Sequence, residues 1–363
     1  MGFKKIEFKD FITLQRGFDL PTKDRNKGEY PVVASTSITD YHNDFKVEPP
    51  GVTTGRSGSL GEVLYLKEKF WPLNTTLWVK DFKENNPKYV YYFLTTLNLE
   101  KYNSGAGVPT LNRNHLDSLE IRIHDLDGQE KIASILSAFD DLIENNTRRI
   151  EILEEMARLI YREWFVHFRF PGHEDVKMVD SELGEIPEGW EIKEVRDIVK
   201  RHSKKTVYRK KELSDQGNVI VIDQSTDEYA GFHNNDPDFN AKPDNPYIIF
   251  GDHTCRTELL IRPFSLGPNV VPFSAKNKTL SNYYLFWIVN GLIDTKEYKR
   301  HWTSFKNNKV SVGPSKLGYA FEELVKPAIT QINLLRKQNN VLTETRDILL
   351  PRLISGQINV ESL

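Results

Sequence analysis

Two stretches, LIENNTRRIEILEEMARLIYREWF (residues 142–165) and LRKQNNVLTETRDILLPRLISG (335–356), place apolar residues at alternating steps of three and four between charged ones. Around the first stretch, these steps across residues 132–160 select eight apolar residues and one asparagine, Asn146. A narrow apolar stripe with one polar member is typical of a coiled-coil seam. The pattern predicts a helix from near Gln129 to about Phe165, roughly 55 Å long.

The second stretch continues the same pattern over residues 332–353, where five apolar residues accompany Asn339 and Arg346. Arg346 interrupts the stripe, and we expect it to mark the point at which the seam frays. Because helices with mostly polar faces are marginal alone in water, the two stripes are expected to face each other. The alternative is that each helix packs on its own domain.

The segments that precede the two helices resemble each other in the same order. Five matches occur at offsets between 187 and 196 residues, which indicates a tandem duplication of a unit of roughly 190 residues. The matches pair FKKIEFKDFI (3–12) with WEIKEVRDIV (190–199), Gly55 with Gly251, FWPLNTTLWV (70–79) with FSLGPNVVPF (264–273), YYFLTT (91–96) with YYLFWI (283–288), and Leu153 with Leu342. If a pseudo-two-fold axis relates the units, the helices are antiparallel and Asn146 lies near Asn339, the pair that sets the helix register.

Each unit alternates short β-branched and aromatic runs with Gly, Pro and Asn turns, a pattern that indicates strands. Examples are YPVVAST (30–36), EVLYL (62–66), SLEIRI (118–123) and NVIVID (218–223), and Pro87–Leu97 indicates a short helix. The predicted fold class is α/β, more specifically α+β: two similar domains of mixed sheet plus helices, separated by two long antiparallel helices that form a coiled-coil spacer, with an internal pseudo-two-fold repeat. The expected boundaries are 1–126 for the first domain, 127–170 for the central helix, 171–186 for a linker, 187–325 for the second domain and 326–363 for the distal helix.

The composition excludes several classes of protein. No apolar run approaches the ~18–20 residues that cross a bilayer, and MGFKKIEFKD has no apolar signal core, so we expect a cytoplasmic protein. The single cysteine, Cys255, excludes disulfides and zinc sites built on several thiolates. A net charge of −2 argues against a surface that binds polyanions everywhere.

Basic residues nevertheless gather in two runs. Residues 200–211 hold seven Lys or Arg, and residues 296–309 hold five more, with Trp302 and Phe305 among them. Such runs are most often a solvated face, and basic residues mixed with aromatics are a weak signal for nucleic acid.

A search for catalytic and metal-binding patterns predicts neither. DNPY (244–247) lacks the second proline of the methyltransferase loop that it resembles and is expected to be a turn. His167 and His173 are spaced for no common metal site. GRSGSLG (55–61) is followed by a strand instead of a helix, so it lacks the helix dipole of a phosphate loop, although its N–H groups and Arg56 could hold a DNA phosphate.

The helical stretches quoted above, with LLPRLISGQINV (349–360), resemble the two helical regions of the specificity subunits of type I restriction-modification systems. TTGRSGSLGEV (53–63), FWPLNTTLWV and GVPTLNR (107–113) are similar to that family's first target-recognition domain, and IIFGDHT (248–254) is similar to its second. The likeness covers essentially the whole chain in the family's order.

The resemblance implies a non-catalytic subunit that reads a bipartite site in double-stranded DNA, one half-site per domain. It implies that two methyltransferase subunits dock around the helices and that restriction and translocase subunits join through them. S-adenosylmethionine, ATP and Mg²⁺ would then belong to the partner subunits, and this chain would hold no cofactor.

Arg can pair with guanine and Asn with adenine in the major groove, so the polar loop residues are the candidates for reading DNA. They are Arg16, Arg56, Ser57, Asn74, Asn112 and Arg113 in the first domain, and His253, Thr254, Arg256, Lys306, Asn307 and Lys309 in the second. The alternative for each is a structural role, and Asn74 beside two threonines could brace a turn.

For partner docking we expect the end of the central helix, where exposed Tyr161, Trp164 and Phe165 would be costly without a partner; the alternative is that these rings belong to a core. Two other functions remain open. The chain could be the target-recognition part of a self-sufficient restriction-methyltransferase, or a decoy that captures methyltransferase subunits without reading DNA.

Overall fold

The computed structural model describes residues 2–105, 107–225, 227–293 and 297–360. Contacts divide the chain into two compact units, unit 1 (residues 1–146 and 338–363) and unit 2 (residues 147–337). Both divisions fall inside a long helix, because α4 spans Leu126–Tyr161 and α8 spans Ser315–Ile354. Each unit therefore contains part of both helices.

The described strands of unit 1 form three small sheets. A four-stranded antiparallel sheet has the order β2 (Thr13–Arg16), β8 (Thr76–Asp81), β5 (Gly51–Gly55) and β6 (Val63–Leu66). A three-stranded sheet has the order β4 (Ser37–His42), β3 (Tyr30–Ala34) and β7 (Trp71–Pro72), in which β3 and β7 are parallel. β1 (Phe3–Glu7) pairs with β9 (Glu120–His124). The short helices are α1 (Phe8–Phe11), η1 (Thr22–Asp24), α2 (Pro87–Thr96), η2 (Leu99–Tyr102) and α3 (Arg113–Asp117).

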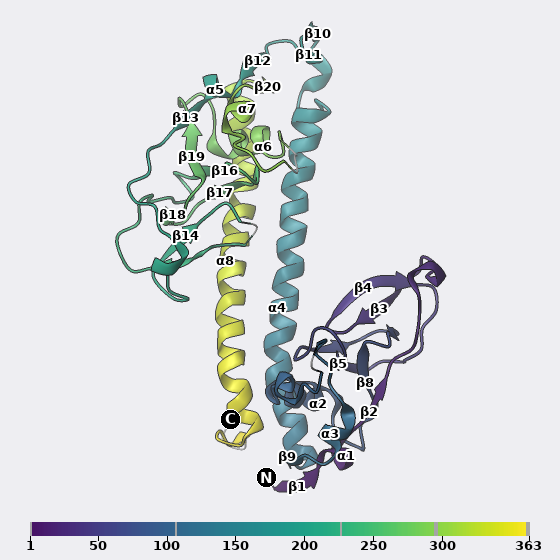
Figure 1. Ribbon diagram of the computed structural model, residues 1–363. Coiled ribbons are helices and arrows are strands. Elements are labelled where there is room, and N and C mark those ends of the chain that lie inside the picture. The colour runs from purple at the N-terminus through teal and green to yellow at the C-terminus, as the bar shows by residue number, and fades with distance from the viewer. Residues whose placement is uncertain (1, 106, 226, 294–296, 361–363) are drawn as a thin grey trace. The chain divides into compact units, whose positions relative to one another are not determined.

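The core of unit 1 forms where α2 packs against α4 (Figure 1). α2 begins where it does because the Asn86 side chain accepts the N–H groups of Lys88 and Tyr89, and a proline occupies its first position. It buries Tyr89 and other aromatic rings together with residues of α1 and the first turns of α4. The first domain is therefore fastened to the helix by a continuous apolar core.

Unit 2 repeats this plan. Its four-stranded sheet has the order β13 (Val199–Arg201), β19 (Val270–Ala275), β16 (Tyr247–Gly251) and β17 (Thr257–Leu260). Its three-stranded sheet has the order β15 (Gly231–His233), β14 (Val219–Ile222) and β18 (Phe264–Leu266), and β12 (Glu191–Glu194) pairs with β20 (Lys309–Val312). The short helices are η3 (Arg162–Val166, a π-helical turn), η4 (His173–Asp175), α5 (Val195–Ile198), η5 (Lys210–Glu212), α6 (Asn282–Val289) and α7 (Trp302–Lys306).

The predicted duplication and fold class are confirmed, because each sheet of unit 1 has a counterpart of the same strand order in unit 2, down to the parallel pair in each three-stranded sheet. One match needs correction. The N-caps Asn86 and Ser281 are 195 residues apart, so Tyr89 corresponds to Tyr284, and the pairing of YYFLTT with YYLFWI at an offset of 192 is wrong. Tyr89 and Tyr284 are both buried, and each hydroxyl accepts a backbone N–H at the end of the equivalent strand, from His124, the last residue of β9, and from Gly313, just after β20.

The seam of the long helices is also confirmed. Every residue that the steps of four and three select between 132 and 160 is buried or half-buried, whereas most of the residues between them are exposed. Within unit 1, Nδ2 of Asn146 donates to Oδ1 of Asn339 at 2.9 Å. Within unit 2, Arg336 on α8 donates to Glu154 on α4 at 2.6 Å. Since rising numbers on α4 meet falling numbers on α8, the pairing is antiparallel, as predicted.

Arg346 does not mark frayed helices, contrary to expectation. Its Nη1 lies 2.6 Å from Oδ1 of Asp140 on α4, and Leu353 beyond it is fully buried. The seam continues past Arg346 because the arginine finds a partner of opposite charge across it.

Two predicted boundaries also differ from the structure. α8 begins at Ser315 instead of residue 326 and runs through Pro327. Although a proline is common only in the first turn of a helix, α8 holds Pro327 in its interior. The segment 171–186 is not only a linker, since β10 (Met178–Ser181) and β11 (Gly184–Pro187) form a hairpin there.

Candidate nucleic-acid interface

In unit 1, four of the six residues predicted to read DNA lie around one hollow of about 930 Å³. Arg16 lies at the end of β2, Arg56 follows β5, and Asn112 and Arg113 begin α3. These residues are far apart in the sequence, and the sheet order β2–β8–β5 together with α3 brings them to one place. Gln15, Asp19 and Asn114 add further polar groups to its walls.

Each guanidinium at this hollow is anchored by only part of its donor set. Arg56 donates from Nη1 to the carbonyl of Asn74 at 3.1 Å, and Arg113 donates from Nη1 to the carbonyl of Leu14 at 3.2 Å. Arg16 is half-exposed and has an ion-pair contact of 3.8 Å with Asp19. Because a guanidinium carries five N–H donors, these arginines keep donors for a phosphate or a base edge.

The loop GRSGSLG is shaped by its first glycine. A Cβ on Gly55 would lie 1.9 Å from the carbonyl oxygen of Ser59, so any larger residue would push the loop open. Ser57 and Asn74 support the same loop. The carbonyl of Ser57 accepts the Ser35 hydroxyl at 2.7 Å, and the Asn74 side chain donates to Asp19. The hydrogen bond to Asp19 is consistent with the predicted alternative for Asn74, that it braces a turn.

Asn112 has a structural duty as well. Its side chain accepts the N–H of Asn114 at 3.1 Å and so caps α3. Asn112 still lines the hollow, so capping and contact with a ligand are compatible.

The six residues chosen in unit 2 do not gather around one hollow. His253, Thr254 and Arg256 occupy the turn between β16 and β17, whereas Lys306, Asn307 and Lys309 lie at the end of α7 and the start of β20. The His253 ring stacks on Tyr298, with centroids 4.7 Å apart, and Lys309 forms an ion pair with Glu182. Thr254 donates its hydroxyl to the carbonyl of Gln224 at 2.7 Å.

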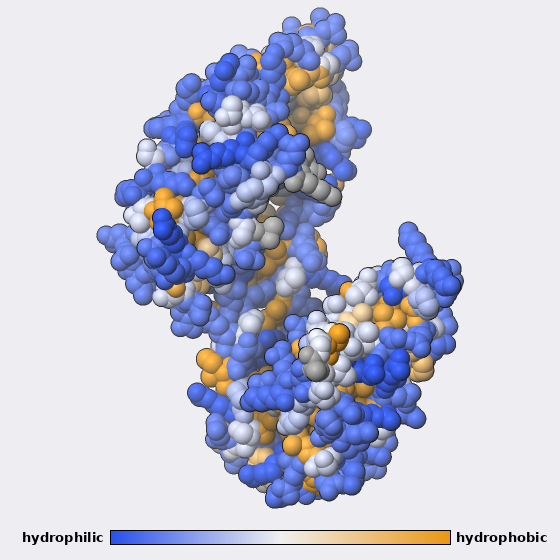
Figure 2. Space-filling model, viewed as in Figure 1, coloured by the Kyte–Doolittle hydropathy of each residue, from blue (hydrophilic) through white to orange (hydrophobic). Residues whose placement is uncertain are grey.

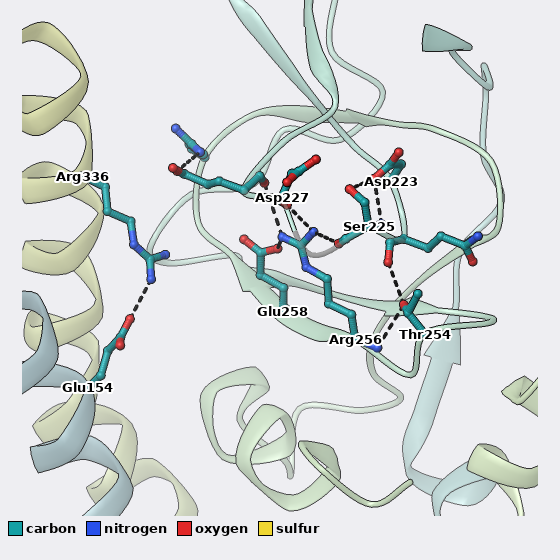
Figure 3. Close-up of polar contacts among 11 residues, drawn as sticks. Glu154, Asp223, Ser225, Asp227, Thr254, Arg256, Glu258 and Arg336 are labelled. Carbon is teal, nitrogen blue, oxygen red and sulfur yellow. Dashed lines mark hydrogen bonds and ion pairs between the residues drawn. The ribbon is translucent and has the colours of Figure 1, made fainter. Parts of the chain in front are cut away.

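Arg256 holds loops together inside unit 2 (Figure 3). Its guanidinium donates to the carbonyls of Ser225, Asp227 and Glu228 and to the carboxylate of Glu258. Burial raises the pKa of Glu258, and the neighbouring arginine opposes this shift. The contacts give Arg256 a structural role, and few of its donors remain for DNA.

The unit 2 counterpart of the hollow has a different lining, which the choice of single residues missed. Arg201, His202, Ser203, Lys204 and Pro272 surround a hollow of about 360 Å³. At the offset of 187 that relates β2 to β13, Ser203 occupies the place of Arg16. The signal was present in the sequence, because these residues open the basic run at 200–211.

Two of these basic groups are held in place. The Arg201 guanidinium lies over the Trp302 ring, 5.9 Å from its centroid. Lys204 Nζ donates to the carbonyl of Gly267 at 3.3 Å, and burial, with Arg201 nearby, lowers the pKa of Lys204. Arg201 and Lys204 are therefore basic groups whose positions at this hollow are fixed by neighbouring groups of unit 2.

The expectation that the three aromatic residues chosen for partner docking are exposed is wrong. Phe165 is buried, and Tyr161 and Trp164 are half-buried against the core of unit 2. Tyr161 stacks on Trp287, and all three rings contact Phe321 of α8. The alternative of a core role is favoured, because the three rings pack in the apolar core of unit 2.

No group of His, Cys, Asp and Glu residues that could hold a metal occurs in the described part of the chain. The DNPY segment forms the expected turn, with backbone hydrogen bonds between Lys242 and Asn245. Among the described residues, no helix is long and apolar enough to cross a bilayer.

Two repeated α+β domains, each with a basic hollow at the same edge of its four-stranded sheet and each resting on the paired helices, define a duplicated recognition scaffold. The model of the type I restriction modification DNA specificity domain matches this chain twice, at residues 1–155 and 187–326. The chain belongs to this family and is a type I restriction-modification specificity subunit with two target-recognition domains.

Similar proteins agree with this assignment. The MjaIX specificity subunit of Methanocaldococcus jannaschii is 29% identical over 304 residues, which are 76% of this chain and 70% of the relative. The putative MjaX specificity subunit of the same organism is 24% identical over 301 residues, 76% of this chain and 69% of the relative. The crystal structure of an S subunit from M. genitalium has the same fold, with a TM-score of 0.71 at 17% identity over 97% of this chain and 96% of that one.

Proposed function

We propose that this chain is a non-catalytic subunit that recognises a bipartite DNA site, one half-site per target-recognition domain, and brings methyltransferase subunits to it. The observation that carries the proposal is that each repeated domain has a basic hollow beside the same edge strand, β2 in unit 1 and β13 in unit 2. A duplicated fold with diverged hollows is what reading two different half-sites requires.

The unit 1 hollow has the chemistry for direct contact with DNA. Arginine pairs with the O6 and N7 acceptors of guanine, and each good pair contributes about 1–3 kcal/mol of discrimination. Asn112 and Asn114 add amide groups of the kind that pair with adenine. In unit 2, Arg201 and Lys204 suit phosphate contacts, which set position but carry no sequence information.

The long helices would set the distance between the half-sites. Half-sites one helical turn apart are separated by about 34 Å along DNA. A stiff helix pair makes binding of the second half-site intramolecular once the first is bound, which raises affinity without new contacts. The antiparallel seam, with Asn146 against Asn339, is the feature that supports this part of the proposal.

Exposed apolar residues on the two helices favour docking of two copies of one partner. On α4, Ile152, Met156 and Leu159 are exposed at helical spacing, and on α8, Val341 and Ile348 are exposed at the positions equivalent to Ile152 and Leu159. Figure 2 shows a mostly hydrophilic face on which apolar residues form separate patches. Equivalent stripes on equivalent helices suit two methyltransferase subunits, through which restriction and translocase subunits would join.

Cofactors would belong to the partners. The sequence has no Walker loop and no glycine-rich dinucleotide motif, so we propose that S-adenosylmethionine, ATP and Mg²⁺ are held by the methyltransferase and restriction subunits. Because the proposed ligand is host or invading DNA, we place the complex in the cytoplasm.

The test is to express the chain with its methyltransferase in a host that lacks both, and to map methylated adenines by sequencing. The expected result is a motif of two short sequences separated by a fixed number of unread base pairs. A contiguous motif would contradict the proposal. Binding of S-adenosylmethionine by the isolated chain would support a self-sufficient restriction-methyltransferase instead, and a reconstituted complex that shifts no DNA would support a decoy.

A further inference from the structure

Arg346, Asp140 and Tyr92 form a polar junction in unit 1. Nη1 of Arg346 on α8 donates to Oδ1 of Asp140 on α4 at 2.6 Å. The other carboxylate oxygen of Asp140 accepts the hydroxyl of Tyr92, which lies on α2 and is 3% exposed. Arg346 also donates from Nη2 to Asp347 at 2.8 Å. One carboxylate therefore joins the first target-recognition domain to both long helices.

The same three places in unit 2 carry no such junction. At the offset of 189 that relates the long helices, Arg346 corresponds to Ala157 and Asp140 to Ile329. At the offset of 195 that relates α2 to α6, Tyr92 corresponds to Trp287, which stacks on Tyr161. The same fold therefore forms in unit 2 with apolar residues at these places. The polar junction in unit 1 is not needed for the fold to form, which points to another role.

A polar junction differs from an apolar contact in being directional. Apolar packing depends mainly on the area removed from water, so a small slide or tilt of the domain changes its free energy little. Charge-assisted hydrogen bonds lose strength as soon as distance or angle departs from the optimum. In a half-buried site, a carboxylate that loses its partners is also costly. The junction therefore penalises displacement of α2 along the helix pair.

We propose that Tyr92, Asp140 and Arg346 are positioning residues that fix the first target-recognition domain on the helix pair and thereby restrict the spacer length that the complex accepts. The inference rests on the proposed function. One base pair changes the separation of the half-sites by only about 3.4 Å. Loosening of one domain on its helices by a comparable distance is enough to admit a neighbouring spacer length.

The sharpest variant is Tyr92→Phe, which removes the bond from domain to helix and leaves the ring and the pair of Asp140 with Arg346 in place. The full chain is expressed with its methyltransferase, and adenine methylation is compared at sites with the normal spacer and with one base pair more or fewer. The ratio of off-length to normal methylation is expected to rise about tenfold over wild type, with both half-site sequences unchanged.

Two further variants make the test specific. Tyr91→Phe changes the neighbouring tyrosine, whose ring packs on Tyr65 and whose hydroxyl lies near Asp140 and Arg346 without a hydrogen bond to either, so it should leave the ratio at the wild-type value. Asp140→Asn, which weakens both bonds at once, should raise the ratio at least as far as Tyr92→Phe.

The outcomes separate this inference from the proposed function. An unchanged ratio in both Tyr92→Phe and Asp140→Asn would overturn the inference, and so would a uniform loss of methylation at every spacer length, which is what a purely structural role predicts. If the wild-type complex gave no two-part motif, the proposed function would fail first and the inference with it.

Discussion

Arg56 in unit 1 and Asp252 in unit 2 occupy the same place in the repeated fold, one residue after the glycine that ends β5 and β16. Arg56 lines the hollow of unit 1. Asp252 instead accepts the N–H groups of His301 and Trp302 at the start of α7, at 3.1 and 2.9 Å. A basic group available to a ligand has been exchanged for an acidic group that caps a helix.

This difference teaches how the two halves diverged. The sheets and their order are the same, so the backbone delivers equivalent positions to one edge of each domain. What occupies those positions differs in charge and in duty, from Arg16 and Arg56 in one unit to Ser203 and Asp252 in the other. A shared scaffold with different polar groups would give each domain its own half-site.

The largest expected effect comes from replacing one of the two target-recognition domains. Exchange of residues 1–126 for the corresponding domain of another specificity subunit should change one half of the methylated motif completely and leave the other half intact. Sequencing of methylated adenines measures the result, and the reciprocal exchange of residues 187–325 is the control. Changes in both halves would mean that the two units do not read DNA independently.

Next in size is the loss of a buried ring that only unit 2 has at its helix end. Phe165→Ala should lower the free energy of unfolding of unit 2 by about 3–5 kcal/mol, because it empties the centre of an aromatic cluster. The matched variant in unit 1, Ile354→Ala, removes fewer atoms and should cost about 2–5 kcal/mol. Denaturant unfolding followed by tryptophan fluorescence measures both, and a Phe165→Ala chain as stable as wild type would restore the docking role.

Arg256 and Arg56 should separate structure from recognition. Arg256→Met breaks an ion pair with a largely buried Glu258 and should cost about 3 kcal/mol of stability at neutral pH. Arg56→Met should leave stability within about 0.5 kcal/mol and weaken DNA binding by about 1–3 kcal/mol. Thermal unfolding measures the change in stability, and DNA titration of the reconstituted complex measures the change in affinity. If Arg256→Met weakened DNA binding and Arg56→Met lowered stability, Arg256 would be the recognition residue and Arg56 the structural one.

The pH dependence of the Arg256→Met variant has a defined sign. Burial raises the pKa of Glu258 in the folded state, so the stability that this group contributes is present at low pH and is lost as pH rises through the folded pKa. Arg256 lowers the pKa of Glu258, so without Arg256 this pKa rises further. The variant should therefore go on losing stability up to a higher pH than the wild type does. The gap in stability to wild type should therefore narrow on acidification towards the unfolded pKa of glutamate.

The smallest loss of stability expected from breaking a buried contact concerns the polar pair at the centre of the seam. Asn146→Ala leaves Asn339 without the amide that donates to it and should cost about 1–3 kcal/mol in unit 1. The double variant Asn146→Leu with Asn339→Leu should recover most of that stability, because an apolar pair fits the stripe. Unfolding of all three chains measures this, and a double variant less stable than Asn146→Ala would argue against the seam.

Much of this architecture could be predicted from the sequence because it depends on local periodicity and on repetition. The steps of four and three selected the seam residues, and matched segments in the same order revealed two units. Burial of an apolar stripe is a property of one helix and its spacing, so the pattern is complete within each segment. Asn146 and Asn339 stood out for the same reason, as asparagines within largely apolar stripes.

Only the tertiary structure decided what each polar or aromatic side chain does. Arg16, Arg56 and Arg113 share a hollow because a sheet and a helix join segments nearly one hundred residues apart. The sequence predicts Arg256 as a DNA-reading residue, but in the fold its guanidinium is bound by three carbonyls about thirty residues away and by Glu258. Hydrogen-bond partners and burial depend on which segments meet in space, and periodicity along one segment carries no record of its neighbours.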